Sequence, residues 1–434
     1  MNQHASVTVE TIDLARSISA IADLCHPVLA EHHHLTAYIT ARLAAAMGAP
    51  DDEAETWTLA AALHDLGALS LGERLAALDL PLAFEDEQHS EPGAALVSTF
   101  PPFAEAGAVI RFHHRWWDRG EGAEPVHGIA VPKGSFVVAV ADRIAVLAVS
   151  PGERATLPER TLEYLRSKSD TQFDPDLVSA FADIADEAAF WYDIDSIRAG
   201  GDSAASSSLW HPLASGRSID MDEARLDELA RMAARLIDFK SRFTASHSVG
   251  VSVVAHALAD LLDLSADQRK RLRLAGYLHD AGKMAVPTEL LEKPGPLTED
   301  EWRVVQTHPY LTYRMLASMP CWQDLSFAAL HHQKPDGTGY PFHLEPDEVP
   351  LEAAVMTVAD VATALTEDRP YREGMGHAAA DVMRQMQREG RLDAEVAETL
   401  FRNFDVIDEI RAGAQAAAVE DFEEFTRSYR EDGE

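Results

Sequence analysis

Apolar residues recur at intervals of three and four along most of the chain, as expected for helices that bury one face. The same segments are rich in Ala, Leu, Glu and Arg, which favour helix. The clearest apolar stripe comprises Val251, Val254, Ala255, Leu258, Leu261 and Leu262. A second comprises Leu272, Ala275, Leu278 and His279, and the glycine at 282 is predicted to end that helix. Phe136–Val140 has a strand-like composition, but its surroundings favour helix. We therefore predict an all-α fold.

A Gly- and Ser-rich stretch divides the chain almost in half. Residues 200–218 read GGDSAASSSLWHPLASGRS and lack apolar periodicity, which indicates a linker. We predict one domain over residues 1–199 and a second over 219–434. Residues 218–241 read as an amphipathic helix that enters the second domain, and they are a candidate surface for domain packing or for a homodimer.

The two halves repeat one pattern of histidine and aspartate. His32 precedes His64 by 32 residues, as His247 precedes His279, and the flanks ALHDLGALS and YLHDAGKMA match. The other matched positions lie 218 or 219 residues apart: His89 with His308, His113-His114 with His331-His332, and Asp142 with Asp360. Ten of the 19 histidines fall into these pairs, which indicates a tandem duplication.

Five histidines and two aspartates in each half suit a metal centre. Imidazole and carboxylate are ligands for borderline and hard divalent ions, and seven such groups can hold two ions. An aspartate directly after a ligating histidine can bridge two ions. Cysteine is absent from the set, which argues against a structural zinc site.

The second half resembles the HD-GYP family within the HD superfamily of metal-dependent phosphohydrolases. Three segments carry the resemblance: HDAGK at 279–283, HHQKPDGTGYP at 331–341 and ADVATALTEDRPYR at 359–372. The resemblance implies two tandem HD-type helical bundles, the first degenerate. It also implies two divalent ions, iron or manganese, and hydrolysis of a cyclic dinucleotide, typically cyclic di-GMP, by a metal-bridging hydroxide.

The resemblance assigns roles to individual positions of the second half. Asp280 takes the bridging position, Lys283 contacts the scissile phosphate, and Tyr340 belongs to the loop that names the family. Arg369 and Arg372 match positions that hold substrate phosphates. The metal ligands are His247, His279, Asp280, His308, His331, His332 and Asp360.

Three departures from the family pattern matter. Gln333 replaces the glutamate that usually follows the histidine pair, and Thr363 replaces a second aspartate. Phe243 stands where members with three metals have a glutamate, so we expect two ions.

The first half keeps the ligand positions and loses the substrate-binding ones. Ala68 stands at the lysine position, Glu121-Gly122-Ala123 at the GYP position and Pro151 at the first arginine, although Arg154 matches Arg372. We therefore expect metal binding without the same hydrolysis. The candidate ligands are His32, His64, Asp65, His89, His113, His114 and Asp142.

The formal charge is −35, from 37 basic and 72 acidic residues. Such a surface repels nucleic acid and anionic membranes, so a phosphate ligand needs bound metal and a few placed cations. Cys25 and Cys321 are expected to be free thiols. With neither a signal peptide nor a membrane span in the pattern, we expect a cytoplasmic protein.

Two other functions fit the same residues. One is a di-iron HD-type oxygenase or other phosphohydrolase, and the other is a non-catalytic metal- or nucleotide-binding signalling module. Trp116-Trp117 beside the first histidine pair could stack on a base, but packing in the core or at an interface is the simpler interpretation.

Overall fold

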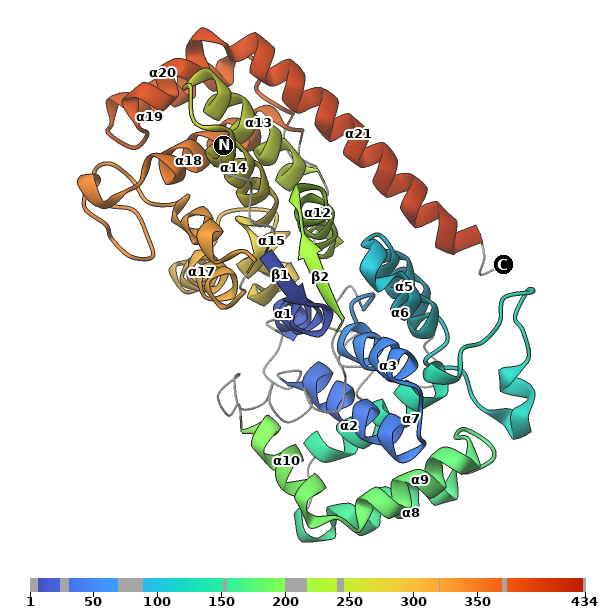
Figure 1. Cartoon of the computed structure of the whole chain (residues 1–434). Helices are drawn as coiled ribbons and strands as arrows, with labels where there is room; N and C mark the ends of the chain where they lie inside the picture. The colour runs from blue at the N-terminus through green and yellow to red at the C-terminus, as the bar shows by residue number, and fades with distance from the viewer. Residues whose placement is uncertain are drawn as a thin grey trace. The chain divides into compact units, whose positions relative to one another are not determined.

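The structure is a computed structural model that describes residues 7–23, 31–68, 89–150, 154–199, 217–239, 246–319, 321–368 and 373–431. The chain divides into two compact units, Met1–Asp220 and Met221–Glu434. Helices dominate both, and the described residues contain only one sheet, of two strands, β1 (Val7–Glu10) and β2 (Ser218–Met221). The predicted all-α class is confirmed (Figure 1).

The first unit is built around three packed helices. These are α2 (His32–Ala46), α3 (Asp51–Leu63) and α7 (Lys133–Val149), which contact one another. Around them lie α1 (Thr11–Asp23), α5 (Ser90–Ser98), α6 (Ala104–Ile110), α8 (Leu157–Ser167), α9 (Pro175–Ala185) and α10 (Ala188–Arg198). The strand-like residues 136–140 lie inside α7 and are buried, so helix is confirmed there.

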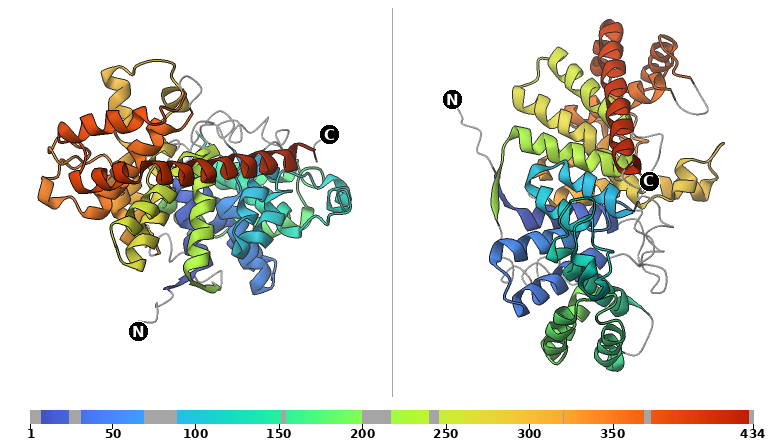
Figure 2. Two further views of the ribbon diagram at one scale, coloured as in Figure 1. Left: turned by 90° about the horizontal axis from the view of Figure 1, so that it is seen from above. Right: turned by 90° about the vertical axis from the view of Figure 1, so that its right-hand side faces the viewer.

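The second unit repeats this arrangement. Its central helices are α13 (His247–Leu261), α14 (Ala266–Leu278) and α18 (Leu351–Thr366), which pack together. The remaining α-helices are α12 (Glu223–Phe239), α15 (Thr288–Leu291), α16 (Glu299–Val305), α17 (His308–Ser318), α19 (Ala378–Arg388), α20 (Ala394–Arg402) and α21 (Phe404–Glu431). Helix α21 is one long helix of 28 residues that packs on α13 (Figure 2).

One predicted helix boundary and one residue predicted to be on a buried face differ in the structure. The amphipathic helix begins at Glu223, because residues 218–221 pair as strand β2 with β1; the Thr8 hydroxyl donates to Asp220 Oδ1 over 2.7 Å. The predicted linker lies outside the described residues up to position 216. Leu261 is 43% exposed rather than part of the buried stripe, because it is the last residue of α13.

Gly282 does not end helix α14, which stops at Leu278. Gly282 lies in the 3-10 helix η5 (Ala281–Ala285), where its lack of a side chain permits a close backbone contact. A Cβ at this position would be 2.0 Å from the carbonyl oxygen of His308. Gly67 in the first unit has the same relationship to His89, with a distance of 2.0 Å. The glycine therefore lets the HD segment approach the third histidine in both units.

Candidate metal centres

Matched histidines and aspartates occupy matching places in the two units. His32 and His247 begin α2 and α13, whereas His64 and His279 directly follow α3 and α14. Asp142 and Asp360 lie within α7 and α18. His89 directly precedes α5, and its counterpart His308 begins α17. The pair His113-His114 follows α6, and the pair His331-His332 follows the 3-10 helix η6 (Gln323–Leu330). Helix ends thus bring side chains from separate parts of the chain to one point.

In the second unit, Asp280 lies between two groups of histidines. Its Oδ2 is 3.3 Å from Nε2 of His279, and its Oδ1 is 3.3 Å from Nε2 of His308 and 3.8 Å from that of His331. One group is His247, His279 and Asp280, and the other is His308, His331 and His332. Within each group the ligand atoms lie within 4.8 Å of one another. A carboxylate that faces two donor groups with different oxygens can bridge two ions.

Asp360 lies next to the group formed by His247, His279 and Asp280. Its Oδ1 lies 3.2 Å from Nε2 of His247 and 3.9 Å from Nε2 of His279. Burial would raise the pKa of Asp360, but hydrogen bonding and positive charge from the histidines lower it strongly. All seven ligand positions predicted for the second unit therefore converge.

Backbone carbonyls orient most of the imidazoles. His279, His308 and His331 each direct Nδ1 to the carbonyl oxygen three residues earlier, over 2.7 to 2.9 Å. A carbonyl can only accept, so each Nδ1 carries the proton and Nε2 keeps its lone pair. Burial is the main cause that lowers the pKa of His308 to about 3 and that of His331 to about 4. The rings of His308 and His331 are therefore neutral at pH 7, as metal ligation requires.

The second unit holds its first histidine with a residue that the sequence interpretation missed, Glu367. His247 Nδ1 lies 3.0 Å from Glu367 Oε2, and Gln415 of α21 donates to the same oxygen over 3.1 Å. Gln415 also donates to the carbonyl of Ser246, next to His247. Burial opposes a charge on His247, but Glu367 and Asp360 raise its pKa to about 10. A carboxylate behind a ligating histidine is a common support of metal sites.

The buried donor atoms fit a metal. His279 Nε2 and Asp280 Oδ1 are buried and have no hydrogen-bond partner among the described residues. Buried polar atoms without partners are costly, and a bound ion would satisfy them. Imidazole nitrogen with carboxylate oxygen suits first-row divalent ions such as Mn²⁺, Fe²⁺ or Zn²⁺.

Two expected substrate residues lie at this cluster. Lys283 Nζ donates to Asp280 Oδ2 over 2.5 Å, and the side chain is 25% exposed. Tyr340 stacks on the ring of His332, with centroids 4.7 Å apart. Burial, together with the charges of Asp280 and Asp360, raises the pKa of Tyr340, so its phenol stays protonated and can donate. Arg369 and Arg372 lie outside the described residues, as does Phe243.

The departures at positions 333 and 363 have structural consequences. Gln333 is buried and its Oε1 accepts from the backbone N–H of Leu344 over 3.1 Å, so this residue holds the GYP loop. Thr363 is fully buried on α18, and its hydroxyl has no hydrogen-bond partner among the described residues. Glu367, four residues later, supplies the carboxylate that contacts His247.

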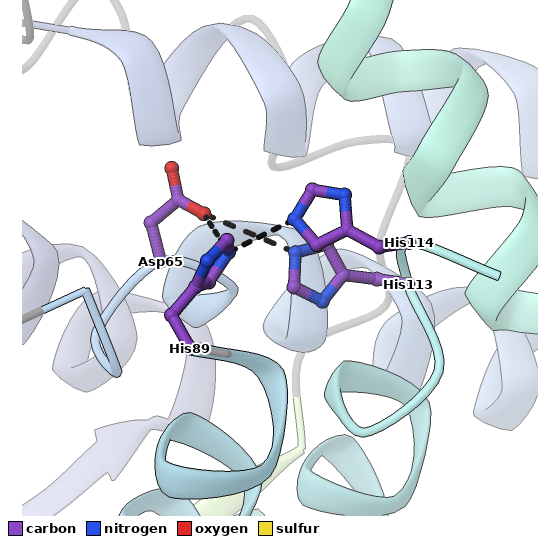
Figure 3. Close-up of side chains that lie close together, drawn as sticks. All are labelled: Asp65, His89, His113 and His114. Carbon is purple, nitrogen blue, oxygen red and sulfur yellow. Dashed lines mark hydrogen bonds and ion pairs between the residues drawn. The ribbon is translucent and has the colours of Figure 1, made fainter. Parts of the chain in front are cut away.

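The first unit also brings its seven predicted positions together. Asp65 Oδ1 is 3.2 Å from Nε2 of His89 and 3.4 Å from that of His64, and its Oδ2 is 3.7 Å from His32. Figure 3 shows Asp65, His89, His113 and His114 pointing toward one another; their ligand atoms lie within 4.8 Å. His32, His64 and Asp142 form a second group.

His32 is the member of the triple histidine that reaches both aspartates. Its Nε2 lies 3.2 Å from Asp142 Oδ1. His33 pairs with Asp23 over 2.5 Å and His34 with Glu31 over 2.5 Å, although His33 also lies close enough to His64 and Asp65 to join a ligand set. The spacing argument for His32 agrees with this geometry.

The substrate positions of the first unit differ as the sequence indicated. Ala68 is buried, Glu121-Gly122-Ala123 lie in a 3-10 helix, and Pro151 lies outside the described residues. Arg154 is paired with the carboxylate of Asp195. Trp117 is half-buried and packs edge-on against the buried Phe136, whereas Trp116 is 42% exposed, so only Trp117 packs against the core.

Both units match known protein families. Residues 29–147 and residues 225–396 each match an HD domain family. The chain therefore belongs to the HD superfamily of phosphohydrolases, with one copy of the domain in each half. No helix in the described part of the chain is long and apolar enough to cross a membrane. The cytoplasmic location and the homodimer stay predictions.

Several curated proteins are similar in sequence. The chain is 29% identical over 390 residues, 86% of each chain, to the 3'3'-cGAMP-specific phosphodiesterase 1 of Vibrio cholerae. It is 35% identical over 218 residues to the 3'3'-cGAMP-specific phosphodiesterase 3 of that organism and 37% identical over 216 residues to a cyclic di-GMP phosphodiesterase of Pseudomonas aeruginosa. These two alignments span 50% and 46% of this chain and 46% and 50% of the relatives.

A solved structure shares the fold over almost the whole chain. It is a crystal structure of a cyclic GMP-AMP-specific phosphodiesterase of V. cholerae, which superposes with a TM-score of 0.62 at 22% sequence identity. The match covers 95% of this chain and 98% of that one. At this identity the likeness establishes the fold and no more.

Proposed function

We propose that the protein is a metal-dependent phosphodiesterase that hydrolyses a cyclic dinucleotide, and that the cluster of the second unit performs the reaction. The observation that carries the proposal is the position of Asp280 between two groups of imidazoles, with the Lys283 ammonium on the same carboxylate. The names of the similar proteins support the substrate class.

Seven groups of the second unit would hold two divalent ions: His247, His279, Asp280, His308, His331, His332 and Asp360. Such ions supply Lewis-acid polarisation of phosphodiester oxygens and a hydroxide nucleophile at neutral pH. The chain contributes imidazoles that backbone carbonyls orient through Nδ1, and two aspartates that stay ionised.

Lys283 and Tyr340 would act on the substrate. Lys283 is a flexible ammonium at the edge of the cluster, so it can move from Asp280 to a phosphate oxygen when cations reach the carboxylate. Tyr340 is held by its stacking on His332 and by its backbone N–H, which donates to the carbonyl of His332 over 3.2 Å. Its protonated phenol can donate to a phosphate oxygen and stabilise developing charge.

The acidity of the chain is consistent with a small anionic substrate. A net charge of −35 provides no long-range attraction for phosphate, so the binding energy must come from the site itself. Lys283 is one such local charge, and Arg369 and Arg372 remain the proposed further ones.

Turnover of defined substrates tests the proposal. The protein loaded with Mn²⁺ or Fe²⁺ is incubated with cyclic di-GMP and with 3'3'-cGAMP, and the products are separated by chromatography. We expect a linear dinucleotide or mononucleotides from at least one substrate, and loss of activity in Asp280→Ala. No turnover of either substrate would overturn the activity, and an unchanged rate in Asp280→Ala would overturn the assignment to this cluster.

A further inference from the structure

Arg143 is buried beside the seven converging residues of the first unit, which form the N-terminal cluster. It is bound to Asp142, one of the two carboxylates of this cluster. Its Nε donates to Asp142 Oδ2 over 3.0 Å, and its Nη2 donates to the same oxygen. The side chain is 1% exposed. The matching position of the second unit is Val361. Because a guanidinium stays charged in proteins, the first unit carries a fixed buried positive charge at a place where the second has an apolar side chain.

The second unit has a cation at its cluster as well, but of another kind. Lys283 contacts the other aspartate, Asp280, and is partly exposed on a flexible stem. An arriving metal ion can displace such a side chain into water or onto a phosphate. Arg143 is 1% exposed, so its guanidinium cannot move into water in the same way.

The first unit has three overlapping ligand groups, and Arg143 directly contacts a member of only one of them. Asp142 Oδ1 lies 3.2 Å from Nε2 of His32 and 3.7 Å from Nε2 of His64, so these three form the group next to Arg143. A divalent ion in that group would share the carboxylate with the guanidinium and be repelled by it at short range.

The same group lacks the support that its counterpart has. His32 Nδ1 is buried and has no hydrogen-bond partner among the described residues, whereas His247 Nδ1 contacts Glu367. Val149 stands at the position that matches Glu367. A ligand histidine without a carboxylate behind it is less basic and less firmly oriented.

Another group is complete. Asp65, His89, His113 and His114 offer one carboxylate and three imidazoles within 4.8 Å (Figure 3). His113 Nδ1 lies 2.7 Å from the carbonyl of Ile110, so its Nε2, which is buried without a partner among the described residues, is directed into the group. Three nitrogens and one oxygen are a sufficient set for one first-row divalent ion.

We infer that the N-terminal cluster holds a single divalent transition-metal ion between Asp65, His89, His113 and His114, and that Arg143 takes the charge-balancing place of a second ion. Without a second ion the first unit cannot clamp both the attacking and the leaving oxygen of a phosphodiester. The ion would then have a structural or regulatory role.

Counting metal ions in the full-length chain tests this inference. His308→Ala together with His331→Ala disables one ligand group of the second unit, and adding His247→Ala with Asp360→Ala disables the other. The protein with all four substitutions, the background for the variants below, is loaded with Mn²⁺, desalted and analysed for metal and protein. We expect one ion per chain and the electron paramagnetic resonance spectrum of an isolated Mn²⁺. Two ions with a coupled spectrum, or none, would overturn the inference.

Arg143→Val, which installs the residue of the other unit, tests the role of the guanidinium. In the same background it should raise the count from one ion to two, whereas Arg154→Val, a change at a partly exposed arginine of the same unit, should leave it at one. An unchanged count in a folded Arg143→Val protein would contradict the role of Arg143.

A third variant keeps the inference testable if Arg143→Val does not fold. His89→Ala with His113→Ala should reduce the count to zero. An ion that remains bound would show that Asp65, His89, His113 and His114 do not hold it. The counts do not depend on hydrolysis, so failure of the proposed activity and failure of this inference are separate results.

Discussion

Glu367 at the end of α18 accepts a hydrogen bond from Nδ1 of His247, over 3.0 Å, and so fixes the ring that begins α13. Gln415 of α21 holds the same carboxylate, and Arg411 in turn donates to Gln415. All three side chains are buried. The long C-terminal helix thus supports the metal centre through Glu367.

Replacing Glu367 should weaken the centre without removing a ligand. We expect Glu367→Ala to reduce metal affinity or activity about 10- to 100-fold, because His247 loses the group that orients it and raises its basicity. Glu367→Gln keeps an acceptor and should lose less. Chelator competition measures the affinity, with Glu398→Gln, at a half-exposed ion pair on α20, as the control. Equal affinity in Glu367→Ala and the control would contradict the role of Glu367.

Gly282 should not tolerate a side chain, because a Cβ would collide with the carbonyl of His308. We expect Gly282→Ala to destabilise the protein by about 1–3 kcal/mol, the usual range for overpacking, and to displace His308. Gly67→Ala should have the same effect on the first unit. Thermal unfolding and metal content measure both changes.

Gly413→Ala is the matched control, since a Cβ there has no atom within 4 Å. This position lies inside α21, where alanine favours helix by up to about 1 kcal/mol. The control should therefore keep or raise the melting temperature. A Gly282→Ala protein as stable as Gly413→Ala would show that the close approach is not needed.

Cys321 should react slowly with thiol reagents. Burial raises the pKa of its thiol to about 12, so the reactive thiolate is scarce at pH 8. Because the shift is upward, reactivity should rise only as the pH approaches 12, or when the protein unfolds. We expect alkylation at pH 8 to be at least about a hundredfold slower than in urea. Peptide mapping after iodoacetamide treatment, with Cys321→Ser as the control, measures this rate, and equal rates in both conditions would contradict the burial.

The convergence of seven histidine and aspartate positions in each unit could be predicted from the sequence, because a metal centre would restrict residue type and the duplication displays each position twice. Spacing alone was enough to identify His279, His308 and their counterparts in the first half. The helical class followed from the apolar periodicity, although the pattern did not show strand β2, where residues 218–221 pair with a distant segment.

Glu367 and Arg143 could not be found in this way, because neither has a counterpart in the other half. The role of Glu367 depends on the end of α18 meeting the start of α13, which only the packing reveals. Arg143 carried one usable signal: it is a charged residue within the otherwise apolar second half of α7, and a charge in such a place needs a partner.

The most direct test of the account compares Asp280 with its matched aspartate in the first unit, Asp65, in the full-length, metal-loaded protein. The measurement is kcat/KM for the better of cyclic di-GMP and 3'3'-cGAMP in Asp280→Asn and in Asp65→Asn. We predict a loss of more than about a thousandfold in Asp280→Asn and of less than about tenfold in Asp65→Asn, because two-ion catalysis is assigned to the second unit alone. Equal losses, or a larger loss in Asp65→Asn, would contradict that assignment.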